Sequence, residues 1–275
     1  MPLLWAVLGA IQIIHTIHMI HGRRIMEVIA VINQKGGVAK TTTAHALAVG
    51  LTLEGYRVLM VDLDGQKSLT LVTGAKAGSN TALEVLTRKA KAAQAITHTE
   101  SGDIIAATDG LGAADTILKD TGREYRLKEA LKPLNKEFDY CVIDCPPSLG
   151  ILTINALTAA NSCIVPAQAD FLSLQAIGQL EQTIKAVRAY TNRELRIKGI
   201  LITRYSARSV LSREAVEMIQ EKAAELHTKV FEAKIRESVS LKEAQAVRQS
   251  IYAYAPKSNG AKDYKAFIDE IVKEA

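Results

Sequence analysis

From position 26 onward, short runs of apolar and β-branched residues alternate with longer segments in which apolar residues recur every three or four positions. The short runs predict buried strands, and the longer segments predict helices. We expect strands at 28–32, 57–62, 104–107, 140–144, 162–166, 197–203 and 229–235. We expect one helix to follow residue 43, with Ala44, Leu47, Ala48 and Leu51 on one face, and others at 81–89, 111–119, 124–134, 172–190, 209–227 and 262–274.

The predicted strands are almost continuously apolar, which is typical of parallel strands that are buried on both faces. Strands that alternate with helices along the chain predict a parallel sheet with helices on both sides. The sequence therefore predicts an α/β fold: a single domain over residues 26–275, with a mostly parallel, twisted sheet. Asn80 or Thr81 is expected to cap the helix at 81–89.

Residues 1–25 have a different pattern. The stretch is apolar but interrupted by polar residues, among them His15, His18 and His21, which are spaced as on one face of a helix. A signal peptide has basic residues before its apolar core, and this stretch has none. A membrane-spanning helix needs about 20 nearly continuous apolar residues, and the polar residues here interrupt such a run. We interpret it as an extension outside the fold, with a membrane anchor as the alternative; a metal site on the three histidines is conceivable.

The stretch from Val28 to Thr43 carries the clearest chemistry. A buried strand leads into a glycine-containing turn and then into a helix, and backbone N–H groups at such a helix start bind phosphate. Lys40 would neutralise the phosphates, and the Thr41 hydroxyl would hold Mg²⁺. The pattern G-x-x-x-x-G-K-[ST] is not met, because Gln34 replaces the first glycine and Ala39 the second; alanine there is unfavourable if the position needs a positive φ.

Three acidic residues follow predicted strands at their carboxyl ends, where ligands bind in sheets of this kind. Asp144 ends one strand and is placed to bind Mg²⁺, usually through water. Asp62 ends another strand. Asp64 lies two residues further on, faces the same side, and is the candidate to orient an attacking water. The alternative is that these acids only cap helices.

The composition gives limited information about the partner and the cellular compartment of the protein. The chain has 275 residues, of which 48% are hydrophobic, and a net charge of +5, which suits an anionic partner. Its three cysteines, Cys141, Cys145 and Cys163, form no disulfide framework and indicate a reducing cytosol. We interpret them as small buried hydrophobic residues.

Several segments resemble the ParA/MinD family of ATPases, and specifically its ParA/Soj branch. The segment KGGVAKTT at 35–42 resembles the family's deviant Walker A box, in which an extra lysine, here Lys35, opens the loop. VDLDGQKSLT resembles the D-x-D-P-Q segment, with Gly65 in place of Pro, and YCVIDCPPSLGILTINALTAA resembles the Walker B segment and its following helix. The resemblance extends from Met26 to Ala275, and MEVIAVINQKGG is how such proteins usually begin.

The resemblance implies a P-loop fold that binds ATP and Mg²⁺. Lys35 would reach across a sandwich homodimer to the partner's nucleotide, Lys40 would bind the phosphates, and Asp64 would position water. Mg²⁺ would be held by Thr41, Asp62 and Asp144. The residues implied in nucleotide binding are Lys35, Gly36, Gly37, Val38, Ala39, Lys40, Thr41, Thr42, Thr203, Arg204 and Pro256.

The resemblance also implies a function in partitioning DNA. Dimers of this kind bind double-stranded DNA without sequence preference, and a ParB-like partner stimulates hydrolysis and release, in the cytoplasm on the nucleoid. Glu237 and Ser240 replace residues that are often basic in relatives. The candidate DNA contacts are Arg208, Arg213, Arg236, Lys242 and Arg248, with Arg204 and Lys234 on the same basic surface.

Three other functions were weighed against this one. A MinD-like ATPase that cycles on membranes needs a basic amphipathic tail, whereas this chain ends in the short, acidic DEIVKEA. An ATPase that positions a protein cargo is not separated from DNA partitioning by the sequence. A reductase like the nitrogenase iron protein needs cysteines that bridge a cluster, and Cys141 and Cys145 are not placed for that.

Overall fold

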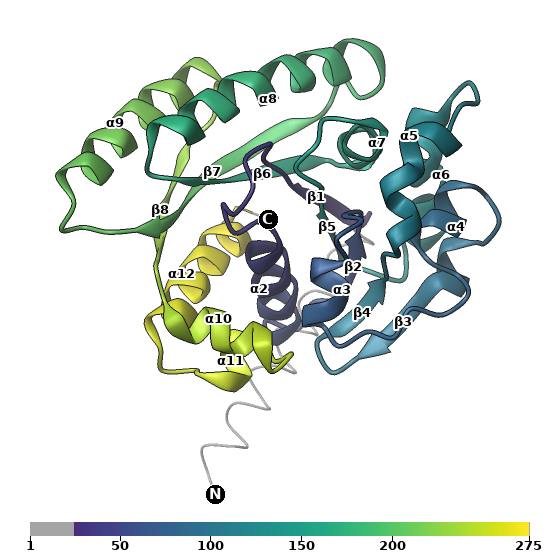
Figure 1. Ribbon diagram of the computed structural model, residues 1–275, viewed down its shortest axis with the longest axis horizontal. Coiled ribbons are helices and arrows are strands. Elements are labelled where there is room, and N and C mark those ends of the chain that lie inside the picture. The colour runs from purple at the N-terminus through teal and green to yellow at the C-terminus, as the bar shows by residue number, and fades with distance from the viewer. Residues whose placement is uncertain (1–24, 275) are drawn as a thin grey trace, which may run out of the picture.

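The apolar runs predicted as strands lie in the middle of the protein, where helices cover both of their faces (Figure 1). The computed structural model describes residues 25–274. Its strands are β1 (Glu27–Val31), β2 (Val58–Asp62), β3 (Ile96–Thr99), β4 (Gly102–Ile105), β5 (Tyr140–Asp144), β6 (Ser162–Gln168), β7 (Arg196–Tyr205) and β8 (Val230–Arg236).

These strands form one sheet in the order β3-β4-β2-β5-β1-β6-β7-β8. All neighbours pair in parallel except β3 and β4, which form an antiparallel hairpin at one edge. The mostly parallel α/β sheet was predicted correctly, but β3 was not. It contains only four residues, and it is held to β4 by a tight turn in which the Thr99 hydroxyl donates to the Gly102 carbonyl at 2.8 Å.

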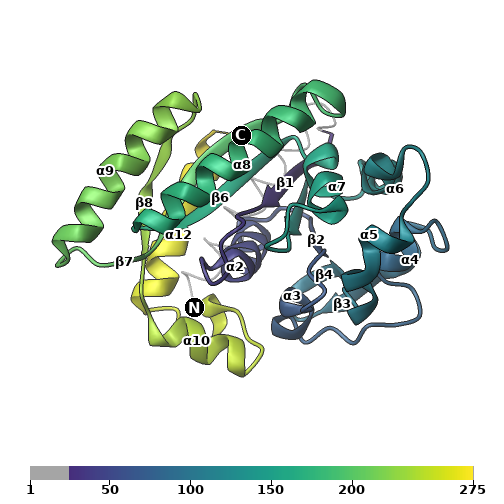
Figure 2. The ribbon, with the colours of Figure 1, turned by 45° about the horizontal axis from the view of Figure 1, so that its top comes forward.

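Two groups of helices cover the two faces of the sheet (Figure 2). Along β1, Ile29 and Val31 pack on the side of α2 and α12, whereas Val28 and Ala30 pack on the side of α7 and α8. The helices are α2 (Lys40–Leu53), α3 (Ser68–Val72), α4 (Ala82–Leu86), α5 (Ala114–Ile117), α6 (Arg126–Leu131), α7 (Ile151–Ala159), α8 (Phe171–Tyr190), α9 (Val210–Glu225), α10 (Val239–Ala246), α11 (Ile251–Tyr254) and α12 (Asn259–Lys273).

The helix predictions were wrong in two kinds of place. The expected helices at 111–119 and 124–134 are broken into short α and 3-10 turns, because Gly110 and Gly112 weaken the start of the first and Pro133 ends the second. The short helices α3, α10 and α11 were not predicted at all, since helices of five, eight and four residues are too short to show a helical repeat of apolar positions. Thr81 is the cap of α4, and its N–H donates to Glu84 at 3.1 Å.

The sheet register brings the predicted acids to the start of the glycine-containing loop. Asp144 on β5 lies opposite both Val31 of β1 and Asp62 of β2. All three are the last residues of their strands, so the loop after β1 and the two carboxylates share one edge. A fully buried Val, Leu or Ile side chain stabilises the fold by roughly 1.5–3 kcal/mol. The site therefore lies at the end of the buried central strands of the sheet.

The described fold begins at Met26, which is 1% exposed and donates its N–H to the Asn135 carbonyl at 3.3 Å. Ile25 is 75% exposed. The rest of the predicted extension, with its three histidines, lies outside the described residues, so the boundary at residue 25 stays a prediction. Within residues 25–274, no helix has the length and apolar character that crossing a bilayer requires.

Candidate functional site

The loop between β1 and α2 is fastened to β6 and β7 by buried polar contacts. Asn33 is fully buried; its Nδ2 donates to the Pro166 carbonyl at 2.7 Å, and its Oδ1 accepts from the Lys35 N–H at 2.9 Å. The Thr203 hydroxyl donates to the Val38 carbonyl at 3.1 Å. These contacts hold the loop in one shape without help from a ligand.

Two residues of the loop have left-handed backbone conformations. Gly37 has a φ of 74°, and Ala39, directly before α2, has φ 68° and ψ 33°. A side chain in this conformation costs about 1 kcal/mol. Ala39 therefore has the positive φ at which alanine is less favourable than glycine. A Cβ atom added to Gly36 or Gly37 would meet no atom within 4 Å. The loop backbone is therefore open on that side to an approaching ligand.

Lys40 is the first residue of α2 and is only 8% exposed. Its Nζ donates to the Lys35 carbonyl at 3.3 Å. Burial lowers the pKa of Lys40, and the charges of Asp144, Cys145 and Asp64 oppose this shift. An ammonium group held away from water beside a helix N-terminus is a strong site for phosphate.

The two acids at the strand ends differ in their surroundings. Both are fully buried. One oxygen of Asp62 accepts from the N–H and hydroxyl of Thr70 at 2.8 and 2.7 Å, and the other accepts from the Asp64 N–H at 3.0 Å. Burial raises the pKa of Asp62 to about 6, although these hydrogen bonds lower it. Asp62 thus fixes the turn that carries Asp64.

Asp144 has no such partners. Neither of its carboxylate oxygens accepts a hydrogen bond from any residue that the structure describes. Burial, followed by the charge of Asp62, raises the pKa of Asp144 well above its ordinary value, and the nearby Thr41 hydroxyl and Lys40 ammonium oppose this. A buried carboxylate without partners is unfavourable unless something else binds it.

A divalent cation fits this arrangement. Within residues 25–274 no group of three His, Cys, Asp or Glu side chains is placed to enclose a metal ion. Mg²⁺ needs no such cage, because it commonly binds through one carboxylate, a hydroxyl, water and substrate phosphates. Thr41 and Asp144, whose hydroxyl and carboxylate lie near each other, could hold it. Asp62 was also expected to bind the metal; its oxygens accept hydrogen bonds from Thr70 and Asp64, and its role at the metal stays a prediction.

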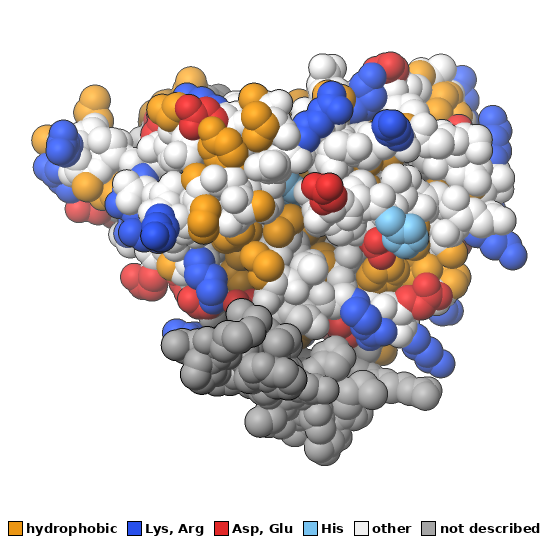
Figure 3. All heavy atoms as spheres, turned by 90° about the horizontal axis from the view of Figure 1, so that it is seen from below, with side chains coloured by type: hydrophobic (Ala, Val, Ile, Leu, Met, Phe, Trp, Pro, Cys, Tyr) orange, Lys and Arg blue, Asp and Glu red, His pale blue; other side chains and the backbone are white. Residues whose placement is uncertain are grey.

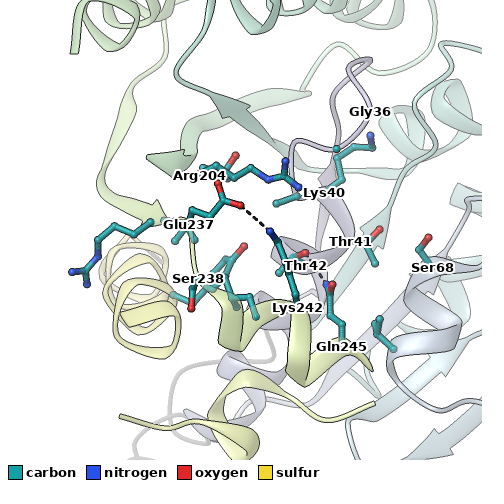
Figure 4. A pocket seen from close by; sticks show the side chains of 18 of the residues that line it. Gly36, Lys40, Thr41, Thr42, Ser68, Arg204, Glu237, Ser238, Lys242 and Gln245 are labelled. Carbon is teal, nitrogen blue, oxygen red and sulfur yellow. Dashed lines mark hydrogen bonds and ion pairs between the residues drawn. The ribbon is translucent and has the colours of Figure 1, made fainter. Parts of the chain in front are cut away.

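The loop forms one wall of a cavity of about 450 Å³, a volume typical of small-molecule sites (Figure 4). We call residues 36–42 the loop wall. The opposite side, residues 235–245 at the end of β8 and on α10, is the α10 wall. Asp64, Ser68 and Pro147 also line the cavity. Figure 4 shows Glu237 between Arg204 and Lys242, with the two walls joined where the Gln245 amide donates to the Thr42 hydroxyl at 2.8 Å.

Most of the residues predicted to bind a nucleotide meet in this cavity. Pro256 does not: it is exposed in the turn between α11 and α12 and is not part of the lining. Val38 is buried beneath the loop, and Lys35 points elsewhere. The predicted residues that line the cavity are Gly36, Gly37, Ala39, Lys40, Thr41, Thr42, Thr203 and Arg204.

The α10 wall was missed as part of the site. Its charged residues had been interpreted as DNA contacts, and α10 itself had not been predicted. No pattern in the sequence showed that this segment turns back over the loop. The cavity residues that the sequence did not indicate are Ser68, Leu71, Val72, Pro147, Ile235, Glu237, Ser238, Leu241, Gln245 and Tyr264.

The candidate DNA contacts divide into two sets. Arg236 is bound to Asp263, with NH2 2.6 Å from Oδ1, and Lys242 to Glu237, with Nζ 2.9 Å from Oε1; both basic residues line the cavity. Arg208, Arg213 and Arg248 are exposed on the surface. On the face seen in Figure 3, basic side chains are spread around the edge among acidic ones rather than gathered in one patch.

Comparison with known proteins agrees with this geometry. The protein-family profile described as AAA domain matches residues 26–197. The chain is 38% identical over 250 residues to the sporulation initiation inhibitor protein Soj of Bacillus subtilis, covering 89% of this chain and 98% of Soj. It is 37% identical to the chromosome partitioning protein ParA of Myxococcus xanthus, covering 90% of this chain and 88% of that protein.

The fold is also similar to a solved structure that contains a nucleotide. The crystal structure of cobyrinic acid a,c-diamide synthase from Mycobacterium smegmatis, with bound ATP analogue and magnesium, matches with a TM-score of 0.78 and 37% identity. The match covers 91% of this chain and 96% of that chain. In that structure the nucleotide and magnesium are bound to the neighbouring protein. The chain belongs to the ParA/Soj family of P-loop ATPases.

Proposed function

We propose that the protein is a DNA-partitioning ATPase whose ATP-bound form is a homodimer that binds double-stranded DNA without sequence preference. A ParB-like partner would stimulate hydrolysis and so release the DNA, in the cytoplasm on the nucleoid. The observation that carries the ATPase part is the buried pair of Lys40 and Asp144 below an open, left-handed loop. The similarity to the chromosome partitioning protein ParA of Myxococcus xanthus supports the partitioning part.

The residues of the loop wall would bind and orient the nucleotide. The N–H groups of the loop and the Lys40 ammonium bind the phosphates, while Thr41 and Asp144 hold Mg²⁺. The bound ion supplies positive charge at the phosphate oxygens. Asp64 lines the cavity, and its Oδ1 accepts from the Gln66 N–H at 2.9 Å, which fixes the carboxylate where it can orient water.

The role of Asp64 has a direct test. Asp64→Ala should bind ATP as the wild type does, because the loop wall is unchanged, but should hydrolyse it about 100-fold more slowly. ATP binding by calorimetry and phosphate release under single-turnover conditions separate the two effects. Gln66→Ala, which removes a neighbouring side chain but keeps the N–H that Asp64 accepts, is the matched control. Normal hydrolysis by Asp64→Ala would show that another group orients the water.

DNA binding is tested by gel shifts on random-sequence duplex with ATP, with ADP and without nucleotide. We expect a shift only with ATP, and a steep loss of binding as salt rises. Arg208→Ala should weaken binding more than Arg236→Ala, since Arg236 is already held by Asp263. If no ATP-dependent shift is seen even at low salt, the DNA part of the proposal fails and a protein cargo becomes the better explanation.

The MinD-like alternative has less support. Its hallmark would be an amphipathic C-terminal helix free to lie on a membrane. In this chain the apolar face of α12, with Tyr264, Phe267, Ile268 and Ile271, is buried against the sheet and α2. Flotation with liposomes, using the full chain and a chain starting at Met26, tests this alternative and any anchoring by residues 1–25.

A further inference from the structure

Lys35, the extra lysine of the loop, is held by its own chain. Its Nζ lies 2.5 Å from Asp170 Oδ2, 3.3 Å from Gln168 Oε1 and 3.4 Å from Ser173 Oγ. Its side chain is 20% exposed. All three oxygens come from the end of β6 and the first turn of α8, so the ammonium group points toward the start of α8.

Asp170 makes two contacts that use its two oxygens separately. Oδ2 binds Lys35, while Oδ1 accepts from the Ser173 N–H at 2.8 Å and so caps α8. Burial raises the pKa of Asp170, but the hydrogen bonds from Lys35 and Ser173 outweigh it and hold the pKa below its ordinary value. The carboxylate is therefore charged at neutral pH and available as a counter-ion.

The same cluster holds the loop itself. Besides its contact with Lys35, Gln168 donates from Nε2 to the Gly37 carbonyl at 3.0 Å, and its N–H donates to the Ser173 hydroxyl at 3.2 Å. A lysine that leaves this cluster gives up an ion pair and two weaker contacts. A phosphate group is the kind of anion that can replace them, because it offers several charged oxygens to one ammonium.

We propose that Asp170 is a positioning residue that keeps Lys35 against its own chain while no nucleotide is bound, so that Lys35 must leave Asp170 before it can reach a phosphate. What Lys35 is released to rests on the ATP-bound homodimer proposed above, in which the family resemblance implies that Lys35 binds the nucleotide of a second copy. The ion pair between Lys35 and Asp170 is a feature of the single chain and does not depend on a second copy. Asp170 is followed at the start of α8 by Phe171 and Leu172, which are 69% and 61% exposed.

The test is the rate at which an N-hydroxysuccinimide acetate ester labels Lys35 in the nucleotide-free protein, read by peptide mass spectrometry. Asp170→Asn keeps an oxygen for the Ser173 N–H but turns an NH₂ group toward Lys35. We expect Lys35 to be labelled about three- to fivefold faster in this variant, as for loss of a partly exposed ion pair. The labelling of Lys40 in the same sample should not change.

Two further variants make the result specific. Asp170→Ser retains a good helix cap but is too short to reach Lys35, and it should behave as Asp170→Asn does. Glu181→Gln removes a carboxylate from the same helix, where it binds Lys185 and Lys222, and it should leave Lys35 unchanged. Thermal melting checks that all variants are folded. If Lys35 is labelled at the wild-type rate in both folded Asp170 variants, the proposal is wrong.

Adding ATP and Mg²⁺ separates this proposal from the proposed function. In Asp170→Asn, a bound nucleotide should slow the labelling of Lys35 again, because its ammonium then binds phosphate. If the substitution accelerates labelling but ATP gives no protection, Asp170 holds Lys35 as proposed and the role of Lys35 at a nucleotide is wrong.

Discussion

The two facing walls of the cavity are held in different ways. The loop wall is supported by fully buried groups: Thr203 binds the Val38 carbonyl, Asn33 binds the Lys35 N–H just before the wall, and Lys40 is almost completely covered. The α10 wall is anchored by Ile235 and Ala244, but its charged side chains are held by ion pairs nearer the surface, such as Glu237 with Lys242, which are 55% and 63% exposed. Exposed ion pairs contribute only about 0–1 kcal/mol and weaken with salt.

This difference teaches which parts of the site are set before a ligand arrives. The loop wall keeps its shape at the expense of an unfavourable conformation at Ala39 and of an unpartnered carboxylate at Asp144. A bound cation would compensate the buried charge of Asp144. The α10 wall carries no comparable strain, so its side chains can rearrange around whatever enters. We therefore expect large effects from changes in the loop wall and small ones from changes in the α10 wall.

The largest effect is expected at Lys40. Lys40→Ala removes a covered ammonium from the phosphate site, and ATP binding should weaken by about 1,000-fold, or ~4 kcal/mol. Calorimetric titration with ATP and Mg²⁺ measures this. Lys185→Ala is the matched control and should leave binding unchanged, because Lys185 is an exposed lysine that pairs with Glu181 and does not line the cavity. Similar losses in both variants would show that the loss at Lys40 does not arise from the phosphate site.

The second-largest effect is the pH dependence of stability that His45 causes, and it tests how deeply α2, the helix that follows the loop, is buried. His45 on α2 is 5% exposed, and its Nε2 lies 3.1 Å from the Ser101 hydroxyl. Burial lowers the pKa of His45 to about 4. The unfolded chain, where histidine has a pKa near 6.5, thus binds more protons than the folded protein between those values, and stability is lost as the pH falls below about 6.5.

His45→Gln should remove this part of the pH dependence. Relative to the wild type, the variant should gain about 3 kcal/mol in unfolding free energy between pH 7 and pH 4, since it has no imidazole to protonate. Urea denaturation at a series of pH values gives the two curves. Parallel curves would mean that His45 is protonated without disturbing α2, and that the support behind the loop wall is looser than its burial indicates.

The sequence predicted the loop wall better than the α10 wall, and the reason is physical. A buried strand, a glycine turn and a helix start are local features, and the acids at 62, 64 and 144 follow apolar runs that fix their place at a sheet edge. For Ala39, the sequence showed only that alanine is unfavourable if the position has a positive φ. By contrast, α10 has only eight residues, half of them polar, and its position over Thr42 depends on contacts between residues about 200 positions apart, such as Gln245 with Thr42. The local repeat of apolar residues cannot predict such long-range contacts.

At Pro256 and Asp62, too, the surrounding fold decides what the sequence could not predict. The exposed Pro256 was assigned to the nucleotide only by resemblance, and no local pattern could show that its turn ends away from the cavity. Asp62 was correctly expected at the strand end, yet its oxygens serve Thr70 and Asp64 rather than standing free. The partners of a buried carboxylate depend on the fold around it.

A smaller effect is expected where the loop wall is strained. Ala39→Gly should raise the free energy of unfolding by up to about 1 kcal/mol, because glycine adopts a positive φ without the penalty of a side chain. The gain is partly offset by the greater freedom of glycine in the unfolded chain. Chemical denaturation measures it, with Ala46→Gly inside α2 as the control, which should instead destabilise the protein. A loss of stability in Ala39→Gly would mean that the loop is not strained at this residue.

The smallest effect on ATP binding is expected from charge changes in the α10 wall. Whether affinity rises or falls shows whether these charges attract or repel the nucleotide. Glu237 lies between Lys242 and Arg204, and both cations lower the pKa of its carboxyl, the bond to Lys242 most strongly. Glu237→Gln removes a negative charge from the cavity mouth and leaves Lys242 unpaired, so ATP should bind about two- to threefold more tightly at low salt. Lys242→Ala should weaken binding by a similar factor. Because both effects arise from exposed charges, they should shrink together as salt is raised to about 0.5 M. If Lys242→Ala instead weakened binding as much as Lys40→Ala does, at every salt concentration, the α10 wall would be as fixed a part of the phosphate site as the loop wall.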